Sequence, residues 1–305
     1  MIYTLTLNPA LDYVVKTEEF LPGELNRMES EQLFVGGKGI NVSRVLKTLG
    51  VSSTAMGFVA GFIGKEIEES LTKEGISTDF VRLGKGNSRI NIKIKAEQET
   101  ELNGKGPKVD IAAKEKLFRK LGCLKKGDIL VMSGSNANGL SDDIYAGIMQ
   151  SLEGRGIDFV VDASGGLLKK ALCFKPWLIK PNKQELEQFF DCRIESTDQA
   201  LIYAKRFLEY GTKNILLSLG KDGAIFVSSQ ELAYKVTAPL GKVVNTVGAG
   251  DSMVAGFLAG HSLYENTEEI LKLAVASGSA TAFSGDLAQK EDIVHLFDKV
   301  MIEKI

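Results

Sequence analysis

The sequence predicts an α/β fold in which a mostly parallel central sheet is covered by helices on both faces. From about residue 108 onward, short apolar strand-like runs alternate regularly with longer segments of helical spacing. The N-terminal part shows the same alternation but is interrupted by two strand-rich inserts, at about 8–35 and 86–106. Since such inserts can pair with each other, we expect the 305 residues to form one domain with a small discontinuous β lid.

The N-terminal elements follow from turn signals and periodicity. An alternating strand at 2–7 stops at the turn signal Asn8–Pro9, and a helix at 40–49 ends before Gly50. In the predicted hairpin at 89–95 and 100–103, isoleucines alternate with polar residues, so that one face is apolar. The other elements expected here are strands at 12–15, 32–35, 54–59 and 80–83 and a helix at 65–73.

The C-terminal elements follow from the regular alternation. A run of small apolar residues at 253–260 predicts a buried helix behind a glycine-rich turn. Two further helices, at 268–283 and 291–301, are expected to close the chain. The other expected elements are helices at 111–121, 142–153, 184–190 and 198–210 and strands at 129–132, 159–161, 177–179, 215–218, 224–227 and 233–236.

Composition excludes several classes of protein and of chemistry. A formal net charge of −2 argues against a nucleic-acid binder, and no apolar stretch reaches the ~18 residues of a membrane span, which predicts a cytoplasmic protein. Three widely spaced cysteines form no disulfide or metal framework, and the chain has only two histidines. Catalysis must therefore rely on carboxylates, basic side chains and backbone amides.

The segment Asn245–Ser252 (NTVGAGDS) is the first candidate site. Gly248, Ala249 and Gly250 would begin the helix, where unpaired N–H groups and the helix dipole favour an anion. Asp251 then places a carboxylate beside a phosphate site, as a general base for phosphoryl transfer requires. The alternative is that Asp251 only caps the helix.

Further candidates lie where strands give way to glycine-rich turns. Gly37 and Lys38 in the segment GGKG, with Asn41 after it, offer close backbone approach, a positive charge and an amide, unless the segment is only a tight turn. Asp12 follows the first core strand and could hold sugar hydroxyls, or it could be an ordinary turn residue.

Asn182 and Glu185 have two interpretations. They could lie near a magnesium ion, largely through water, or they could form a helix capping box. Ser218, Gly220 and Gly223 follow another strand and suit a nucleotide that passes close to the backbone. Neither a P-loop nor a dinucleotide fingerprint is present, so any nucleotide is bound by another device.

Taken together, these motifs resemble those of the ribokinase-like carbohydrate kinases, the PfkB family. The resemblance spans nearly the whole chain and is strongest for the phosphosugar branch. It implies a three-layer α/β/α domain with a β lid. The motifs that carry it are Asn8–Pro9–Ala10-x-Asp12, Gly36–Gly37–Lys38–Gly39-x-Asn41, Ser133–Gly134–Ser135, Lys180–Pro181–Asn182-x-x-Glu185, Ser218–Leu219–Gly220 and Thr246–Val247–Gly248–Ala249–Gly250–Asp251–Ser252.

The resemblance also implies an activity: transfer of the γ-phosphoryl group of ATP to O6 of fructose 1-phosphate, with Asp251 as general base and Gly248–Gly250 as anion hole. Tagatose 6-phosphate and fructose 6-phosphate are the alternative substrates. The implied substrate-binding residues are Asp12, Arg27, Gly37, Lys38, Asn41, Arg89 and Ser135. The implied ATP-binding residues are Lys180, Asn182, Ser218, Gly220 and Gly223, and Asn182 and Glu185 would act on Mg²⁺.

One segment departs from the family pattern, because Asn136–Gly139 replaces the usual Leu-Pro-x-Gly after Ser135. This weakens the inference for Ser135. A non-catalytic sugar-phosphate or nucleotide sensor on the same fold is the remaining alternative. The expected partners are the sugar phosphate, ATP and a second copy of the chain in a homodimer, with no nucleic acid and no membrane.

Overall fold

A parallel sheet with one antiparallel edge forms the centre of the structure, a computed structural model that describes residues 1–305. Its eleven strands run in the order β15-β14-β13-β12-β11-β10-β9-β1-β4-β5, and β6 also pairs with β4. All pairs from β12 to β5 are parallel, whereas β12 to β15 pair antiparallel. The strands are β1 (Ile2–Thr6), β4 (Ser53–Ala60), β5 (Ser77–Thr78), β6 (Val81–Leu83), β9 (Ile129–Ser133), β10 (Asp158–Asp162), β11 (Leu178–Ile179), β12 (Asn214–Ser218), β13 (Ala224–Ser228), β14 (Ala233–Thr237) and β15 (Met301–Lys304).

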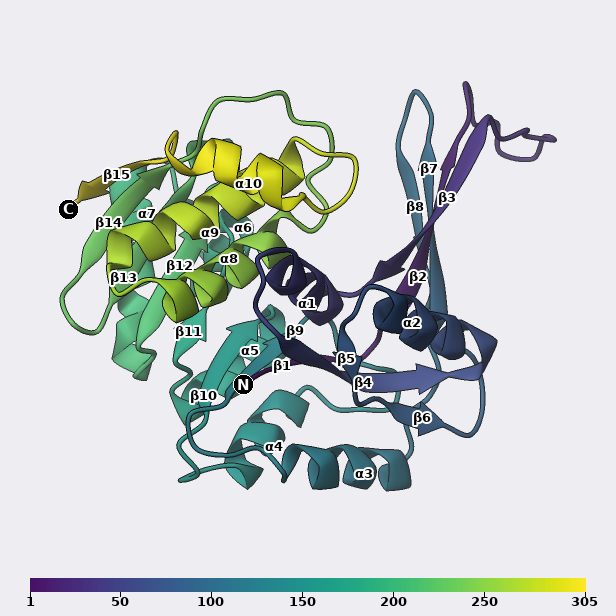
Figure 1. The fold of residues 1–305 in the computed structure, drawn as a ribbon, viewed down its shortest axis with the longest axis horizontal. Coiled ribbons are helices and arrows are strands. Elements are labelled where there is room, and N and C mark those ends of the chain that lie inside the picture. The colour runs from purple at the N-terminus through teal and green to yellow at the C-terminus, as the bar shows by residue number, and fades with distance from the viewer.

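Helices cover both faces of this sheet (Figure 1). One layer is α3 (Ile111–Leu121), α4 (Ile144–Ser151), α5 (Gly165–Ala171), α6 (Lys183–Phe190) and α7 (Thr197–Arg206). The other is α1 (Lys38–Thr48), α8 (Ala249–Leu263), α9 (Thr267–Ala282) and α10 (Lys290–Phe297), with α2 (Gly61–Lys73) at the β4 end.

Strand side chains alternate between the two cores. Leu130 and Met132 of β9 pack in the first core, whereas Val131 between them packs in the second. This two-sided burial explains why the parallel strands are almost continuously apolar. The three-layer α/β/α fold predicted from the sequence is thereby confirmed.

A second, four-stranded sheet in the order β3-β2-β7-β8 extends away from the central domain (Figure 1). It consists of β2 (Ala10–Lys16), β3 (Ser30–Gly36), β7 (Arg89–Lys95) and β8 (Thr100–Asn103), and we call it the lid sheet. The parallel pairing of β2 with β7 joins two segments that are about 80 residues apart, since Ala10 pairs with Arg89.

The two faces of the lid sheet differ from the usual pattern of an amphipathic sheet. Asn91 and Lys93 on the polar face are buried, whereas Leu33, Ile90 and Leu102 on the opposite face are 60%, 40% and 54% exposed. The polar face of the lid sheet is therefore the one that is turned inward, toward the core.

The structure corrects several predicted elements. The chain ends in the edge strand β15 rather than in a helix that reaches residue 301, because α10 stops at Phe297 and the last residues pair with β14. The helix predicted at 65–73 begins earlier, at Gly61. The strand predicted at 80–83 corresponds to β6, and the two-residue strand β5 before it was not predicted. The short helix α5 was not predicted. None of the helices combines the length and apolar character that a membrane crossing requires.

Small residues bring α8 and α9 unusually close together. A Cβ built on Gly256 would lie 2.5 Å from both the Leu273 carbonyl oxygen and Ser277 Oγ, which is closer than real Cβ atoms approach. This contact fixes the direction of α8, and therefore the place where its first turn meets the carboxyl edge of the sheet.

We predict that Gly256→Ala lowers the free energy of unfolding by about 1–3 kcal/mol, because the added methyl group overpacks the α8–α9 contact. The matched control is Gly147→Ala in α4, where the added Cβ would meet Phe118 at an ordinary 3.8 Å. This control should gain up to about 1 kcal/mol from helix propensity. Urea denaturation of both variants measures the difference, and equal stability of the two would contradict the packing argument.

Candidate active site

The first turn of α8 forms the centre of the candidate site. Gly248 precedes the helix with φ 80°, a left-handed conformation that suits glycine, and a Cβ there would lie 2.7 Å from Leu287. Ala249, Gly250 and Asp251 are then the first three helical residues. Since the first N–H groups of a helix lack intrahelical acceptors, this turn can bind an anion.

Asp251 is buried and does not act as a helix cap. Its side chain, 5% exposed, accepts a hydrogen bond on Oδ2 from Asn41 Nδ2 at 2.8 Å, across to α1. Burial and, secondarily, the nearby charge of Asp162 raise the pKa of Asp251 to about 7, against the lowering effects of Lys38, the Asn41 hydrogen bond and Lys180. A carboxylate with a pKa near the working pH is suited to general-base catalysis.

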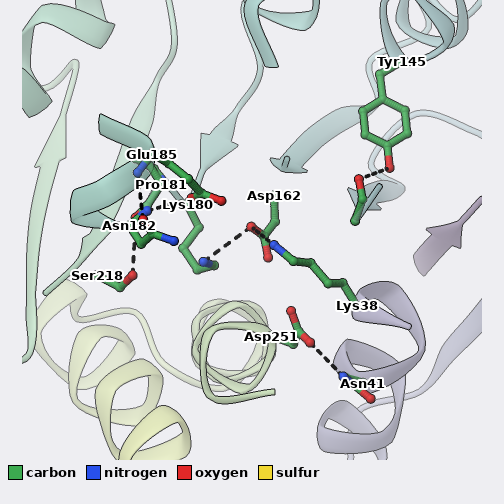
Figure 2. A network of polar contacts seen from close by, with 11 residues as sticks. Lys38, Asn41, Tyr145, Asp162, Lys180, Pro181, Asn182, Glu185, Ser218 and Asp251 are labelled. Carbon is green, nitrogen blue, oxygen red and sulfur yellow. Dashed lines mark hydrogen bonds and ion pairs between the residues drawn. The ribbon is translucent and has the colours of Figure 1, made fainter. Parts of the chain in front are cut away.

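Asp162 is at the centre of a buried ion cluster (Figure 2). It ends β10 with no exposed surface, and its Oδ1 lies 3.2 Å from Lys38 Nζ and 3.4 Å from Lys180 Nζ. The carboxylate of Asp162 is the main cause of the raised pKa of Lys38. Lys180 is also next to the first turn of α8, because a Cβ on Gly250 would lie 3.0 Å from its Nζ.

The sequence interpretation missed Asp162. The signal was available, because a carboxylate at the carboxyl end of a buried parallel strand is the same pattern that drew attention to Asp12. Asp162 was not singled out, although the glycine pair Gly165–Gly166 follows it after Ala163 and Ser164.

Asp12 lies on the lid sheet rather than on the core, and its carboxylate is held on both oxygens. Asn91 Nδ2 donates to Oδ1 at 2.8 Å, and Lys93 Nζ is 3.1 Å from Oδ2. A Cβ on Gly36 would lie 2.8 Å from this carboxylate, so the glycine leaves room for it. Asn91 and Lys93 were not predicted, because they appeared only as the polar side of an amphipathic strand.

The lid sheet and the core enclose a hollow between them. The lid contributes Asp12 and Lys93 among others, and Asn41 contributes from α1. The complete lining is Asp12, Val14, Gln32, Phe34, Val35, Gly36, Asn41, Arg44, Lys93, Lys95, Glu99, Asn245, Val247, Gly285, Asp286 and Leu287. Acidic, basic and amide groups that converge in this way suit a polyhydroxylated anionic ligand.

Three other predicted substrate-binding residues, Arg89, Arg27 and Gly37, do not line the hollow. Arg89 donates to the carbonyl oxygens of Asn8 at 3.1 Å and Gly104 at 3.4 Å, and its burial lowers its pKa. Arg27 is exposed in the loop between β2 and β3 and does not line the hollow. Gly37, with φ 129°, packs its Cα against Thr6 at the start of α1.

Ser135 is exposed after β9 and does not line the hollow either. The loop after it lacks the prolines of the family pattern but is held by a side chain instead. Asn136 Nδ2 donates to the Leu140 carbonyl at 3.0 Å, and Asn136 Oδ1 accepts from the Ala137 N–H at 2.9 Å.

A second cavity, of about 650 Å³, lies on the other side of the first turn of α8. This volume is in the range of small-molecule and cofactor sites. It is lined by Asn182, Ser218, Gly220 and Gly223 of the predicted ATP-binding residues and by Ala249 and Gly250 of the predicted anion hole, whereas Lys180 does not line it. Apolar residues complete the wall, among them Leu240, Val243, Val275 and Phe283.

Asn182 and Glu185 do form the capping box of α6. Asn182 Oδ1 accepts from the Glu185 N–H at 2.8 Å, and Glu185 Oε2 accepts from the Asn182 N–H at 2.9 Å. The capping role therefore exists, but it leaves Glu185 Oε1 without a cap partner. Glu185 also faces the site, because its charge contributes to the raised pKa of Lys38.

These residues fit a magnesium ion that is held mainly by water and substrate oxygens. Magnesium keeps several waters and takes one or two protein carboxylates plus substrate phosphates. Glu185 supplies one such carboxylate beside the nucleotide cavity, and the structure contains no cluster of three or more acidic, histidine or cysteine ligands that would form an all-protein site.

Comparison with known proteins identifies the family. Residues 6–292 match the pfkB family carbohydrate kinases, and the chain belongs to this family. Its ribokinase-like fold and its class, a phosphotransferase that acts on a carbohydrate, are thus established.

Individual relatives are similar along their whole length. A 1-phosphofructokinase of Bacillus subtilis is 43% identical over 100% of both chains, and one of Borreliella burgdorferi is 41% identical over 100% of this chain and 99% of the relative. A D-tagatose-1-phosphate kinase of Bacillus licheniformis is 40% identical over 99% of each chain. The crystal structure of phosphofructokinase-2 from Escherichia coli with substrates and products has a TM-score of 0.92 at 30% identity, covering 97% of this chain and 98% of that one.

We predict that Glu185→Gln separates the capping role from the magnesium role. Glutamine also completes a capping box, so the free energy of unfolding should change by less than about 0.5 kcal/mol. The phosphoryl-transfer rate should fall by about 10–100-fold, because a neutral amide is a poorer partner for a hydrated cation.

The matched control is Asp292→Asn, which occupies the same position in the capping box of α10 and lines neither the hollow nor the cavity. It should leave the transfer rate unchanged. Full activity of Glu185→Gln across a magnesium titration would exclude the metal role.

Proposed function

We propose that the protein transfers the γ-phosphoryl group of ATP to O6 of fructose 1-phosphate, giving fructose 1,6-bisphosphate and ADP. The observation that carries this proposal is the position of Asp251. Its buried carboxylate, with a pKa of about 7, accepts a hydrogen bond from Asn41, which lines the polar hollow, and follows Gly250, which lines the nucleotide-sized cavity. The high identity to two 1-phosphofructokinases supports the choice of sugar phosphate.

The sugar phosphate would bind in the hollow under the lid sheet. Asp12 would accept hydrogen bonds from sugar hydroxyls, with its own carboxylate oriented by Asn91 and Lys93. Asn41 would orient Asp251 through the 2.8 Å hydrogen bond and present its remaining amide atoms to the sugar. Basic side chains of the lid sheet, Lys93 and Lys95 with Arg89 behind them, are suited to the phosphate group.

ATP would bind in the 650 Å³ cavity with its phosphates directed at the first turn of α8. Gly220 and Gly223, which have positive φ values, let the backbone approach the nucleotide. When bound, Mg²⁺ would neutralise charge on the phosphate oxygens, with Glu185 as its carboxylate partner. Lys180 stands beside the N-terminus of α8 and adds a positive charge there.

In the reaction, Asp251 removes the proton from the O6 hydroxyl as this oxygen attacks the γ-phosphorus. A new O6–P bond forms, the bond between the γ-phosphorus and the β–γ bridging oxygen breaks, and ADP leaves with the bond electrons. The N–H groups of the first turn of α8 and Lys180 stabilise charge on the transferring group, which is usually the dominant contribution in phosphoryl transfer.

We predict that Asp251→Asn lowers kcat by at least about 10²-fold, because the amide cannot take the proton. The Kd for ATP should remain nearly unchanged, as measured by calorimetric titration. The matched control is Asp198→Asn, another aspartate in a first helical turn but on the exposed start of α7. A variant that kept a tenth or more of the wild-type rate would show that Asp251 is not the base.

The substrate assignment is tested by ADP release with fructose 1-phosphate, fructose 6-phosphate, tagatose 6-phosphate and tagatose 1-phosphate in parallel. We expect the highest kcat/KM with fructose 1-phosphate. Equal or greater kcat/KM with tagatose 6-phosphate would favour the activity of the tagatose-6-phosphate kinases, which are 38% identical to this chain over 92% of its length. The same result with fructose 6-phosphate would favour a 6-phosphofructokinase. Binding of ATP and sugar phosphate without ADP release from any of the four would instead support a sensor.

We further propose that the protein forms a homodimer through the outer face of the lid sheet. Leu33 on β3, Ile90 on β7 and Leu102 on β8 are exposed on the same face of the four-stranded sheet, and exposed apolar side chains of this kind commonly mark an interface.

Light scattering should give twice the chain mass of 33.1 kDa for the wild type. The variant Leu33→Glu/Leu102→Glu should be monomeric, because two buried charges would oppose association. The control Ile111→Glu, at an equally apolar but remote position that is 78% exposed, should remain dimeric. A monomeric wild type would overturn this assignment.

A further inference from the structure

The carboxylate of Asp162 joins the two lysines that flank the phosphoryl site. Lys38 is the first residue of α1 and Lys180 follows β11, so the two cations reach Asp162 from opposite sides (Figure 2). Both Nζ atoms contact the same oxygen, Oδ1, at 3.2 and 3.4 Å. The other oxygen, Oδ2, is buried without a hydrogen-bond partner.

Burying the Asp162 carboxylate with one unpaired oxygen costs folding free energy, which indicates a role other than stabilising the fold. Buried carboxylates are normally satisfied on both oxygens, and a buried ion cluster seldom stabilises a fold more than apolar packing would. Lysine side chains are long and flexible, so that two ammonium groups beside one helix N-terminus must be held by something rigid. Asp162 ends a central strand and has no exposed surface, which makes it such an anchor.

The four charges of the site form a balanced set. Three charged groups shift the pKa of Asp251: Asp162 raises it, and Lys38 and Lys180 lower it. The hydrogen bond from the neutral Asn41 amide also lowers it. Burial alone would raise the pKa of Asp162, but the charges of Lys180 and Lys38 hold it below its ordinary value, so that Asp162 stays ionised. Asp162 therefore places a permanent negative charge close to Asp251.

We propose that Asp162 is a positioning residue for phosphoryl transfer: its carboxylate holds Lys38 and Lys180 around the first turn of α8 and sets a permanent negative charge near Asp251. This proposal rests on the function proposed above. Its consequence is that Asp251 remains a strong enough base to take a hydroxyl proton, while the lysines are held ready for the phosphate.

The first test uses the free protein and needs no substrate. Carbon-13 NMR of carboxyl-labelled aspartate follows the titration of Asp251, whose signal is assigned by its absence in Asp251→Asn. The wild-type midpoint should lie near pH 7. In Asp162→Asn it should fall by at least about one pH unit, because the repelling charge is gone while both lysines remain.

The matched control is Tyr145→Phe. Tyr145 is a fully buried neighbour whose hydroxyl donates to the Gly134 carbonyl at 3.4 Å and carries no charge. This variant should leave the midpoint unchanged. An unchanged midpoint in Asp162→Asn would overturn the proposal. If that variant does not fold, the wild type alone decides, because a wild-type midpoint near the ordinary aspartate value would also overturn it.

The second test measures pH profiles of the reaction. Because Asp251 must be ionised to act, kcat/KM in the wild type should rise with pH through about 7. Asp162→Asn should shift this rise to lower pH and lower the plateau kcat by about 10²-fold, since misplaced phosphate-binding groups cost about that much. Asp162→Glu, which restores the charge, should return the rise toward the wild-type pH.

A lowered plateau without a pH shift would assign Asp162 a merely structural role, and full recovery at high magnesium concentration would assign it to the metal instead. Either outcome overturns the proposal. The two tests separate this inference from the proposed function, because the NMR midpoint does not depend on which sugar phosphate is used or on whether turnover occurs.

Discussion

The burial of one carboxylate against the positive end of a helix is the constraint on which the rest of the site depends. Asp251 is held in the first turn of α8 and away from water, where its ionised form is unfavourable. The fold tolerates this cost because it supplies Lys38 and Asn41 from α1 and Lys180 from the sheet edge. α8 can reach that position only because glycine and alanine residues bring it close to α9.

The parallel sheet explains why residues from distant parts of the chain meet here. β1, β9, β10, β11 and β12 all run the same way, so their carboxyl ends share one edge. Asp162, Lys180 and Ser218 each follow or end one of these strands. The lid sheet then adds Asp12, Asn91 and Lys93 from the other side, so that neither part of the structure holds a complete site alone.

Much of the fold was predictable because local signals agreed with the final packing. The bounds of β7 and β8 match the predicted hairpin, and the central strands follow from uninterrupted apolar runs. The end of the chain was mispredicted because Met301 and Ile302 continue an apolar spacing, and only pairing with β14 makes them a strand. Long-range pairing of this type is not visible in local periodicity.

The site was less predictable than the fold, for a related reason. Motif residues such as Asn41 and Gly250 were found because glycine-rich turns mark them. Lys93 carries no such mark and meets Asp12 only because β7 pairs with β2, about 80 residues earlier in the chain. Asp162 meets Lys38, 124 residues away, only in the folded chain. Arg27 and Ser135 are the reverse case, because the sequence predicts a substrate contact for each, whereas neither lines the hollow of the single chain. Their role stays a prediction.

The location of Asp12 on the lid sheet has a consequence for how sugar affinity is set. If Asp12 holds the sugar as proposed, it does so from a sheet that extends from the core and has exposed apolar side chains on its outer face, so part of the binding free energy for the sugar would go into restraining that sheet. A second copy of the chain on the exposed face would supply the same restraint in advance. Sugar affinity would then depend on protein concentration, whereas ATP, bound mainly by the core, would be insensitive to it.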